Sequence, residues 1–186
     1  AFEGHYADKS RLLWRLSTAE SIAGSLADSI EHATLAVEMI PPKRGGRGIT
    51  FRNFLSGRLV RIGDLEKAQI EFEKAERTLE EARSWKAWGK WGVFWRSTIL
   101  IAEAKLFYSR GEYEEASPLF QAAIQLVEEN AGQLDDILAL GVGLLREAYL
   151  GTYALNLLRG GNPVEAELQA RAALTSSLDR TGRYTP

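Results

Sequence analysis

Four glycines, each followed by the same spacing of small and apolar residues, constrain the fold of this 186-residue sequence more than any other feature. Small or apolar residues lie two, five, nine and twelve positions after Gly63, Gly111 and Gly161. These residues are Leu65, Ala68, Phe72 and Ala75; Tyr113, Ala116, Phe120 and Ala123; and Pro163, Ala166, Ala170 and Ala173. A weaker copy of the pattern begins at Gly24 and ends at Pro41. The chain therefore contains an internal repeat.

Residues before each glycine follow the same rule. The residue seven positions earlier is small, and the residue four positions earlier is apolar in three of the copies, as at Leu59, Phe107 and Leu157. The Gly24 copy has Glu20 at that apolar position. Glycine permits the tight turn between two antiparallel helices, and small residues allow those helices to approach closely. The pattern thus predicts helical hairpins that must stack on their neighbours to bury their apolar faces.

Apolar residues recur every three to four positions along most of the chain, which is the helical period. The clearest segments are Asp64 to Arg83 and Glu112 to Glu129, and we also expect a last helix at about Pro163 to Leu178. Alternation of the kind seen in strands is not sustained. We therefore predict an all-α fold of about seven to eight helices. The clearest loop is Pro41 to Gly48, because proline ends a helix and glycines start one poorly.

The repeated segments, above all those that begin at Gly63 and Gly111, resemble the tetratricopeptide repeat family. The resemblance implies a right-handed α-solenoid over a single domain, 1–186, with repeats at about 6–41 (degenerate), 49–83, 88–130 and 133–178. The glycines lie 39, 48 and 50 residues apart, whereas the family period is about 34 residues. The helices must be longer or the loops larger than usual. The long-helix arrays beside caspase-like peptidase domains of bacterial proteins look similar, especially at Asn156 to Leu174.

Composition excludes several classes of function. The chain has no cysteine and two histidines, so disulfides, thiol nucleophiles and cysteine-rich zinc sites are excluded. The net charge of −2 argues against nucleic-acid binding. No apolar run is long enough for a membrane helix, and no signal peptide is visible. These features leave the compartment open between cytoplasm and periplasm, and they call for no cofactor. Because the chain starts at Ala1 and ends without a capping helix, we expect it to be part of a longer protein.

Two local features allow more than one interpretation. Trp85, Trp88, Trp91 and Trp95 occupy one arc of a helix, where they form either an aromatic binding platform or, as we favour, a packed core. Gly89 predicts close packing there or a helix that begins after it. The basic segment Lys43 to Gly48 could hold an anion or an RNA backbone, although a solvated loop is the simpler interpretation.

Residues suited to catalysis or metal binding are sparse. His32 lacks further ligands at helical spacing, so we expect an ordinary surface or boundary residue rather than a metal ligand. Glutamates between Glu71 and Glu81 alternate with Lys74 and Arg77, as on a solvated helix face. We therefore predict that the chain is not an enzyme.

The family resemblance implies that the first helix of each hairpin lines a concave groove. Seven residues at the implied groove positions could contact a partner, namely Arg11, Trp14, Asn53, Arg61, Lys105, Tyr108 and Arg159. The implied positions include no Asp or Glu in a chain that is net acidic. Arginine binds carboxylates through two parallel hydrogen bonds, so such a groove suits an acidic peptide. Chance or internal salt bridges would also account for the four cations.

These features predict a protein–protein interaction module that acts as a scaffold or adaptor. A regulatory or sensory domain of a larger enzyme is one alternative. A self-assembling module, in which exposed terminal helices pair with those of other copies, is the other. The partners that we expect are thus a protein or peptide, or a second copy of the chain, and neither nucleic acid nor membrane.

Overall fold

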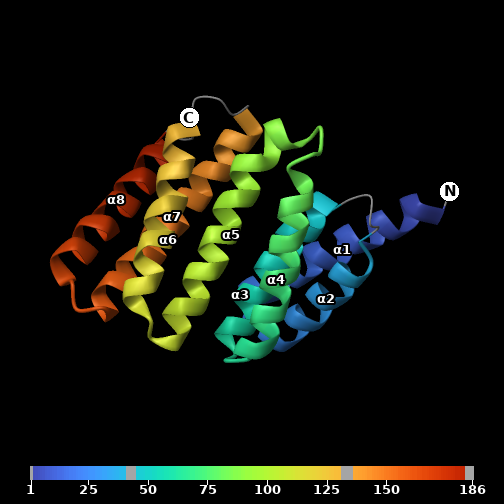
Figure 1. Ribbon diagram of the computed structural model, residues 1–186, viewed down its shortest axis with the longest axis horizontal. Coiled ribbons are helices and arrows are strands. Elements are labelled where there is room, and N and C mark those ends of the chain that lie inside the picture. Colours follow the sequence, from blue (N-terminus) through green and yellow to red (C-terminus); the bar gives the residue numbers. More distant parts are fainter. Residues whose placement is uncertain (1, 41–44, 131–135, 183–186) are drawn as a thin grey trace. The chain divides into compact units, whose positions relative to one another are not determined.

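The computed structural model describes residues 2–40, 45–130 and 136–182, and within these ranges every regular element is a helix. Figure 1 shows them as successive antiparallel pairs. The eight helices are α1 (Phe2–Ala23), α2 (Leu26–Glu38), α3 (Gly45–Arg61), α4 (Leu65–Ala82), α5 (Trp88–Arg110), α6 (Tyr113–Asn130), α7 (Asp136–Arg159) and α8 (Pro163–Gly182). The all-α prediction is confirmed. The right-handed sense of a solenoid and the relationship to tetratricopeptide repeats stay predictions.

Helix boundaries agree with the sequence except before α3. The segments predicted around Gly63, Gly111 and Gly161 begin and end within a few residues of α4, α6 and α8. The predicted loop from Pro41 to Gly48 is wrong at its end, because α3 already begins at Gly45. The buried Ile49 and Phe51 stabilise this first part of α3 through packing, which outweighs the low helix propensity of glycine. Lys43 and Arg44 lie outside the described residues.

Each hairpin turns at one of the four glycines found in the sequence. Gly24, Gly63, Gly111 and Gly161 have φ angles between 79° and 91°, which is the left-handed region that glycine enters without strain. At each turn the N–H of the residue after the glycine donates to the carbonyl of the residue four positions before the glycine. At Gly63, for example, the N–H of Asp64 donates to the carbonyl of Leu59 at 3.0 Å. This bond belongs to the Schellman motif, which ends one helix and redirects the chain into the next.

The helices form two compact units, Ala1–Gly89 and Lys90–Pro186. Unit 1 contains the hairpins α1–α2 and α3–α4, with α2 packed against α3. Unit 2 contains α5–α6 and α7–α8, with α6 packed against α7. Within each unit the second helix of one hairpin thus meets the first helix of the next, as expected for a helical repeat. The single domain over 1–186 stays a prediction.

Small residues bring the helices of unit 1 together. Ser17 on α1 and Ser29 on α2 are fully buried, and the hydroxyl of each donates to the backbone carbonyl of the other at 2.8 Å. The Ser56 hydroxyl donates in the same way to the Ala68 carbonyl, across α3 and α4. These hydrogen bonds join the helices at the positions that the repeat pattern marks as small.

The core of unit 2 is more aromatic. Phe120 is fully buried at its centre, and its ring lies 5.8 Å from that of Tyr153 between centroids. Ala104 and Ala116 occupy the positions of the paired serines and are also fully buried. Asn156 on α7 donates to the Tyr113 carbonyl at 3.0 Å and thereby ties α7 to α6. None of the helices in the described ranges combines the length and the apolar character needed to cross a membrane.

Candidate functional site: a basic aromatic face on α1 and α3

Trp14 is the centre of an aromatic cluster in unit 1. Its ring stacks on that of Phe51 with centroids 4.1 Å apart and an interplanar angle of 9°. Phe54 lies edge-on to Trp14 at 5.7 Å and is exposed. Trp14 comes from α1 and both phenylalanines come from α3, so the cluster joins the first helices of two successive hairpins. These are first helices of hairpins, which the family resemblance implies for the binding side.

Arg58 lies against the same tryptophan. Its guanidinium carbon is 4.7 Å from the centroid of Trp14, at a distance typical of a cation–π contact. Arg58 is only 7% exposed, and within the described residues its Nη1 atom is buried with no hydrogen-bond partner. Burial lowers the pKa of Arg58, the nearby Arg61 lowers it further, and Glu20 opposes both effects. In the described part of the chain, this buried guanidinium thus lies against the Trp14 ring without an ion-pair partner.

Arg61 extends the positive charge toward solvent. It is exposed, and its Nη1 atom donates to the Ser21 hydroxyl at 3.2 Å. Arg52 on the same helix differs, because it is paired with Glu71 on α4. Among the described residues, neither Arg58 nor Arg61 forms such a salt bridge. The end of α3 therefore has two cations close together without a bound carboxylate.

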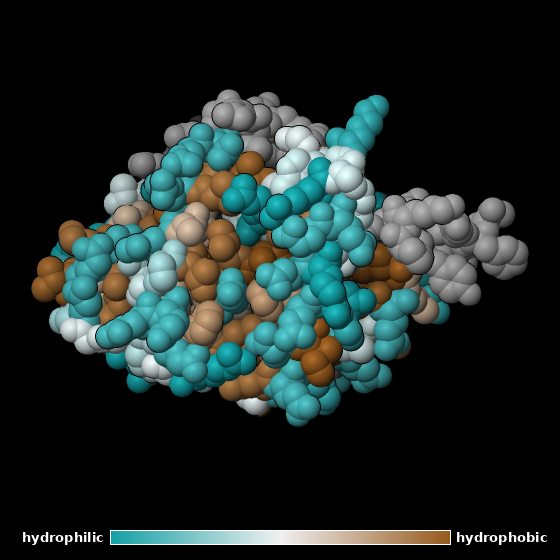
Figure 2. Space-filling view, viewed as in Figure 1, coloured by the Kyte–Doolittle hydropathy of each residue, from teal (hydrophilic) through white to brown (hydrophobic). Residues whose placement is uncertain are grey.

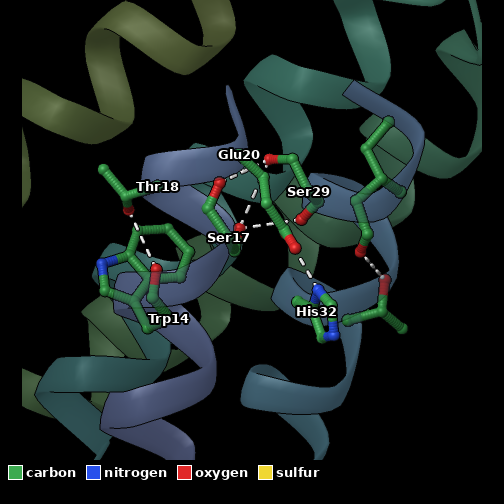
Figure 3. Close-up of polar contacts among 8 residues, drawn as sticks. Trp14, Ser17, Thr18, Glu20, Ser29 and His32 are labelled. Atoms are coloured by element: carbon green, nitrogen blue, oxygen red, sulfur yellow. Dashed lines mark hydrogen bonds and ion pairs between the residues drawn. The ribbon is translucent and has the colours of Figure 1, made fainter. Parts of the chain in front are cut away.

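Hydrogen bonds between α1 and α2 hold the helix that carries Trp14 (Figure 3). The Ser17 and Ser29 hydroxyls join the two helices. The Nδ1 atom of His32 also forms a hydrogen bond of 2.9 Å with the carboxylate of Glu20. Thr18 donates to the Trp14 carbonyl within α1. The hydrogen bond with Glu20 raises the pKa of His32, against a smaller opposing effect of burial. Glu20 occupies a repeat position that is apolar in the other hairpins, and its carboxylate pairs there with His32.

The chemistry of this face is that of recognition. Two guanidinium groups can donate to a carboxylate or phosphate, and an aromatic ring beside them can contact an apolar side chain. The described part of the chain contains no group of three or more histidine and acidic residues that could hold a metal ion. The expected boundary role of His32 agrees with its half-buried place beside Glu20.

The sequence-predicted site residues of unit 1 differ in their surroundings. Trp14 and Arg61 belong to the face just described, and Arg11 is exposed on α1. Asn53 is buried, so its side chain is not offered to solvent.

The other three predicted residues belong to unit 2. Lys105 and Tyr108 are half-buried on α5, and Tyr108 lies edge-on to Tyr113 at 5.6 Å between ring centroids. Arg159 is exposed at the end of α7. The seven residues therefore form two sets, and the basic aromatic face is made by the set in unit 1 together with Arg58.

Arg58 is the residue that the sequence analysis missed. It lies five positions before Gly63, which is not one of the groove positions implied by the family resemblance. The signal was weak, because the equivalent residue is the buried Leu106 before Gly111 but the buried and polar Asn156 before Gly161. Because this position is not apolar in every repeat, spacing alone does not single out Arg58, and its combination of charge and burial is what marks it.

The tryptophan-rich segment has a different character. Trp95 is buried, and its ring stacks with that of Trp91 at 6.5 Å, whereas Trp85 and Trp88 are half-buried. The core interpretation is therefore confirmed for Trp95. Helix α5 begins at Trp88, and a side chain added at Gly89 would meet no atom within 4 Å, so close packing is not the reason for that glycine.

Comparisons with known proteins found no family model that matches the chain and no curated protein that matches it.

Proposed function

We propose that this chain is a non-catalytic interaction module that binds an acidic peptide segment of a partner protein on the α1–α3 face of unit 1. Arg58 and Arg61 contact carboxylates of the peptide, and Trp14 and Phe54 contact an apolar side chain beside them. The related idea of a regulatory domain within a larger enzyme stays a prediction, since it requires a catalytic partner.

The observation that carries the proposal is that neither Arg58 nor Arg61 forms a salt bridge among the described residues, although Glu20 is near enough to raise the pKa of Arg58. Two nearby cations repel each other, and burial of Arg58 removes much of its hydration. The equivalent residues of unit 2 are Leu106 and Asn156, which are both buried and uncharged. A partner carboxylate would relieve the repulsion and form charge-assisted hydrogen bonds, which are the stronger kind.

Binding can be measured with a fluorescent peptide that alternates glutamate and leucine, titrated with the full chain. We expect saturable binding that weakens as salt is added, because exposed charges are screened. A peptide with lysine in place of glutamate should not bind. Arg61→Glu should weaken binding by about tenfold or more, since it replaces an attractive contact with a repulsive one.

Arg83→Glu is the matched control, because Arg83 is an exposed arginine of the same unit at the end of α4. Its reversal changes the net charge equally but leaves the α1–α3 face intact. If the two reversals weaken binding equally, the peptide responds to net charge alone, and the proposed site is wrong.

Arg58→Met separates binding from folding. Methionine can fill the space of the arginine stem against Trp14, and replacing a buried charge by an apolar side chain is often neutral or stabilising. We expect the free energy of unfolding to be unchanged or raised by about 1 kcal/mol. The same variant should weaken peptide binding by about tenfold. Unchanged affinity for the peptide would contradict the role proposed for Arg58.

A further inference from the structure

Unit 2 shows how one hairpin of this chain recognises the next. Helix α6 meets α7 through Ser117, Gln121 and Glu128, which lie six, ten and seventeen positions after Gly111. Their partners on α7 are Asn156, Tyr153 and Arg146, which lie five, eight and fifteen positions before Gly161. The contact distances are 2.8, 2.6 and 2.6 Å. This register defines a stacking face on each kind of helix.

The stacking face of a second helix also includes the residue thirteen positions after its glycine. That residue is Val37 on α2 and Ile124 on α6, and both are buried. On α8 it is Leu174, which is 60% exposed, and the next residue of that face, Leu178, is exposed to the same extent. The α8 edge of unit 2 contributes to the apolar surface in Figure 2.

The stacking face of a first helix includes the residues twelve and eight positions before its glycine. They are Phe51 and Leu55 on α3, and Tyr149 and Tyr153 on α7, and all four are buried. On α1 the equivalent residues are Leu12 and Leu16, which are 64% and 45% exposed. Helix α1 thus presents the face that α3 and α7 bury, and α8 presents the complementary face that α2 and α6 bury.

We infer that α8 of one copy of this chain packs against α1 of a second copy, in the register that joins α6 to α7. The occupant is a second copy because the chain itself carries both halves of an interface that it already forms internally. The pairing is head to tail, because the α8 face of one copy meets the α1 face of the next, and the assembly grows into a chain or closes into a ring. On α8 the positions six and ten after Gly161 are Glu167 and Arg171, which pair with each other, whereas Leu178 stands where Glu128 forms its salt bridge on α6. The apolar part of the contact therefore comes from Leu174 and Leu178.

Sedimentation velocity of the full chain over a range of concentrations tests this inference. We expect the average mass to rise with concentration and the association to persist at high salt, because apolar contacts are not screened. Salt sensitivity distinguishes this association from peptide binding on the α1–α3 face, which salt weakens. A monomer at every concentration would overturn the inference.

Two charge substitutions test the head-to-tail geometry. Leu12→Glu and Leu174→Glu should each raise the dissociation constant by at least about tenfold. A mixture of the two variants should form a one-to-one dimer, because the intact α8 of the first still fits the intact α1 of the second. A mixture that stays monomeric, or self-association of either variant at the original strength, would overturn the inference.

Ile70→Glu is the matched control, because Ile70 is a large exposed apolar residue on α4 that belongs to neither face. It should associate like the original chain. The substituted residues are exposed, so the helical content measured by circular dichroism should be equal in all variants. If Ile70→Glu weakens association as strongly as the other two, general hydrophobicity rather than the stacking register drives the contact, and the assignment fails.

Discussion

Units 1 and 2 use the same turns but hold their helices together differently. Both units reverse the chain at a glycine with positive φ and bury small residues where the helices of a hairpin approach. In unit 1 those small residues are Ser17, Ser29 and Ser56, whose hydroxyls donate to carbonyls of the facing helix. In unit 2 alanines stand at the corresponding places, as at Ala104.

The difference shows which part of the repeat is required for the fold. A close approach of helices requires a small side chain, and either serine or alanine meets that requirement. The hydroxyl is an addition that helps to fix the helices of unit 1, which also support the buried charge of Arg58. Unit 2 relies instead on the aromatic core around Phe120.

The largest expected effect is that of truncating this aromatic core. Phe120→Ala should lower the free energy of unfolding by about 3–5 kcal/mol, because it removes a fully buried ring and leaves a cavity. Leu158→Ala, at an exposed position of the same unit, should change it by less than about 0.5 kcal/mol. Urea unfolding measures both. A loss near 1 kcal/mol for Phe120→Ala would mean that unit 2 is not held by its aromatic core.

Exchanging the small residues should give intermediate effects. The double variant of Ser17→Ala and Ser29→Ala should lose about 1–2 kcal/mol, because two buried hydrogen bonds between helices disappear. Ala104→Ser in unit 2 should be nearly neutral if the new hydroxyl reaches the facing carbonyl of Ala116 as Ser56 reaches Ala68. Thermal unfolding of the three proteins checks this. A neutral double variant would show that the hydroxyls of unit 1 contribute nothing beyond their small size.

Alanine substitutions of two glycines should have opposite signs. Gly63→Ala should destabilise by about 1–2 kcal/mol, because alanine is strained at a φ of 79°. Gly57→Ala should stabilise by about 0.5–1 kcal/mol, since Gly57 is inside α3 and an added Cβ meets no atom within 4 Å. The shift of the urea midpoint measures each. The same sign for both would contradict the turn assignment.

The smallest effect should come from the ion pair between Glu20 and His32, which has no counterpart at the equivalent position in unit 2. Glu20 and the nearby Glu31 and Asp28 raise the pKa of His32, so the folded state binds its proton more tightly than the unfolded chain. The stabilisation is fully present below pH 6.5 while Glu20 is ionised, and it is lost as the pH rises through the folded-state pKa.

The melting temperature should therefore fall slightly between pH 6 and pH 8 for the original chain. In Glu20→Gln this fall should be smaller, because the carboxylate that favours the charged imidazole is gone. An equal fall in both proteins would assign the pH dependence to other groups.

The turns and most helix boundaries could be predicted from the sequence, because they depend on local chemistry. Positive φ requires glycine at Gly63 and Gly111, and the apolar spacing after each glycine follows from the helical period. Packing overrode local propensity at α3, where buried residues stabilise a helix that begins at Gly45.

The candidate site could be predicted only in part. Trp14 and Arg61 were expected on the binding side. The contacts of Arg58 and the Glu20–His32 pair, however, depend on which helices pack together and on how far each is displaced along the axis of the other. Such contacts join residues 12 to 44 positions apart, and spacing within one repeat does not determine them. An internal repeat predicts which residues are equivalent, whereas the exceptions to it need the three-dimensional arrangement.

The most direct test of the central claim follows the five tryptophan indole N–H signals by nuclear magnetic resonance while the glutamate–leucine peptide is added to the full chain. Trp14→Phe identifies the Trp14 signal. We predict that this signal shifts with the peptide concentration and saturates, while the signals of Trp85, Trp88, Trp91 and Trp95 stay in place. A Trp14 signal that does not move, or larger shifts among the other four, would contradict the α1–α3 face as the binding site.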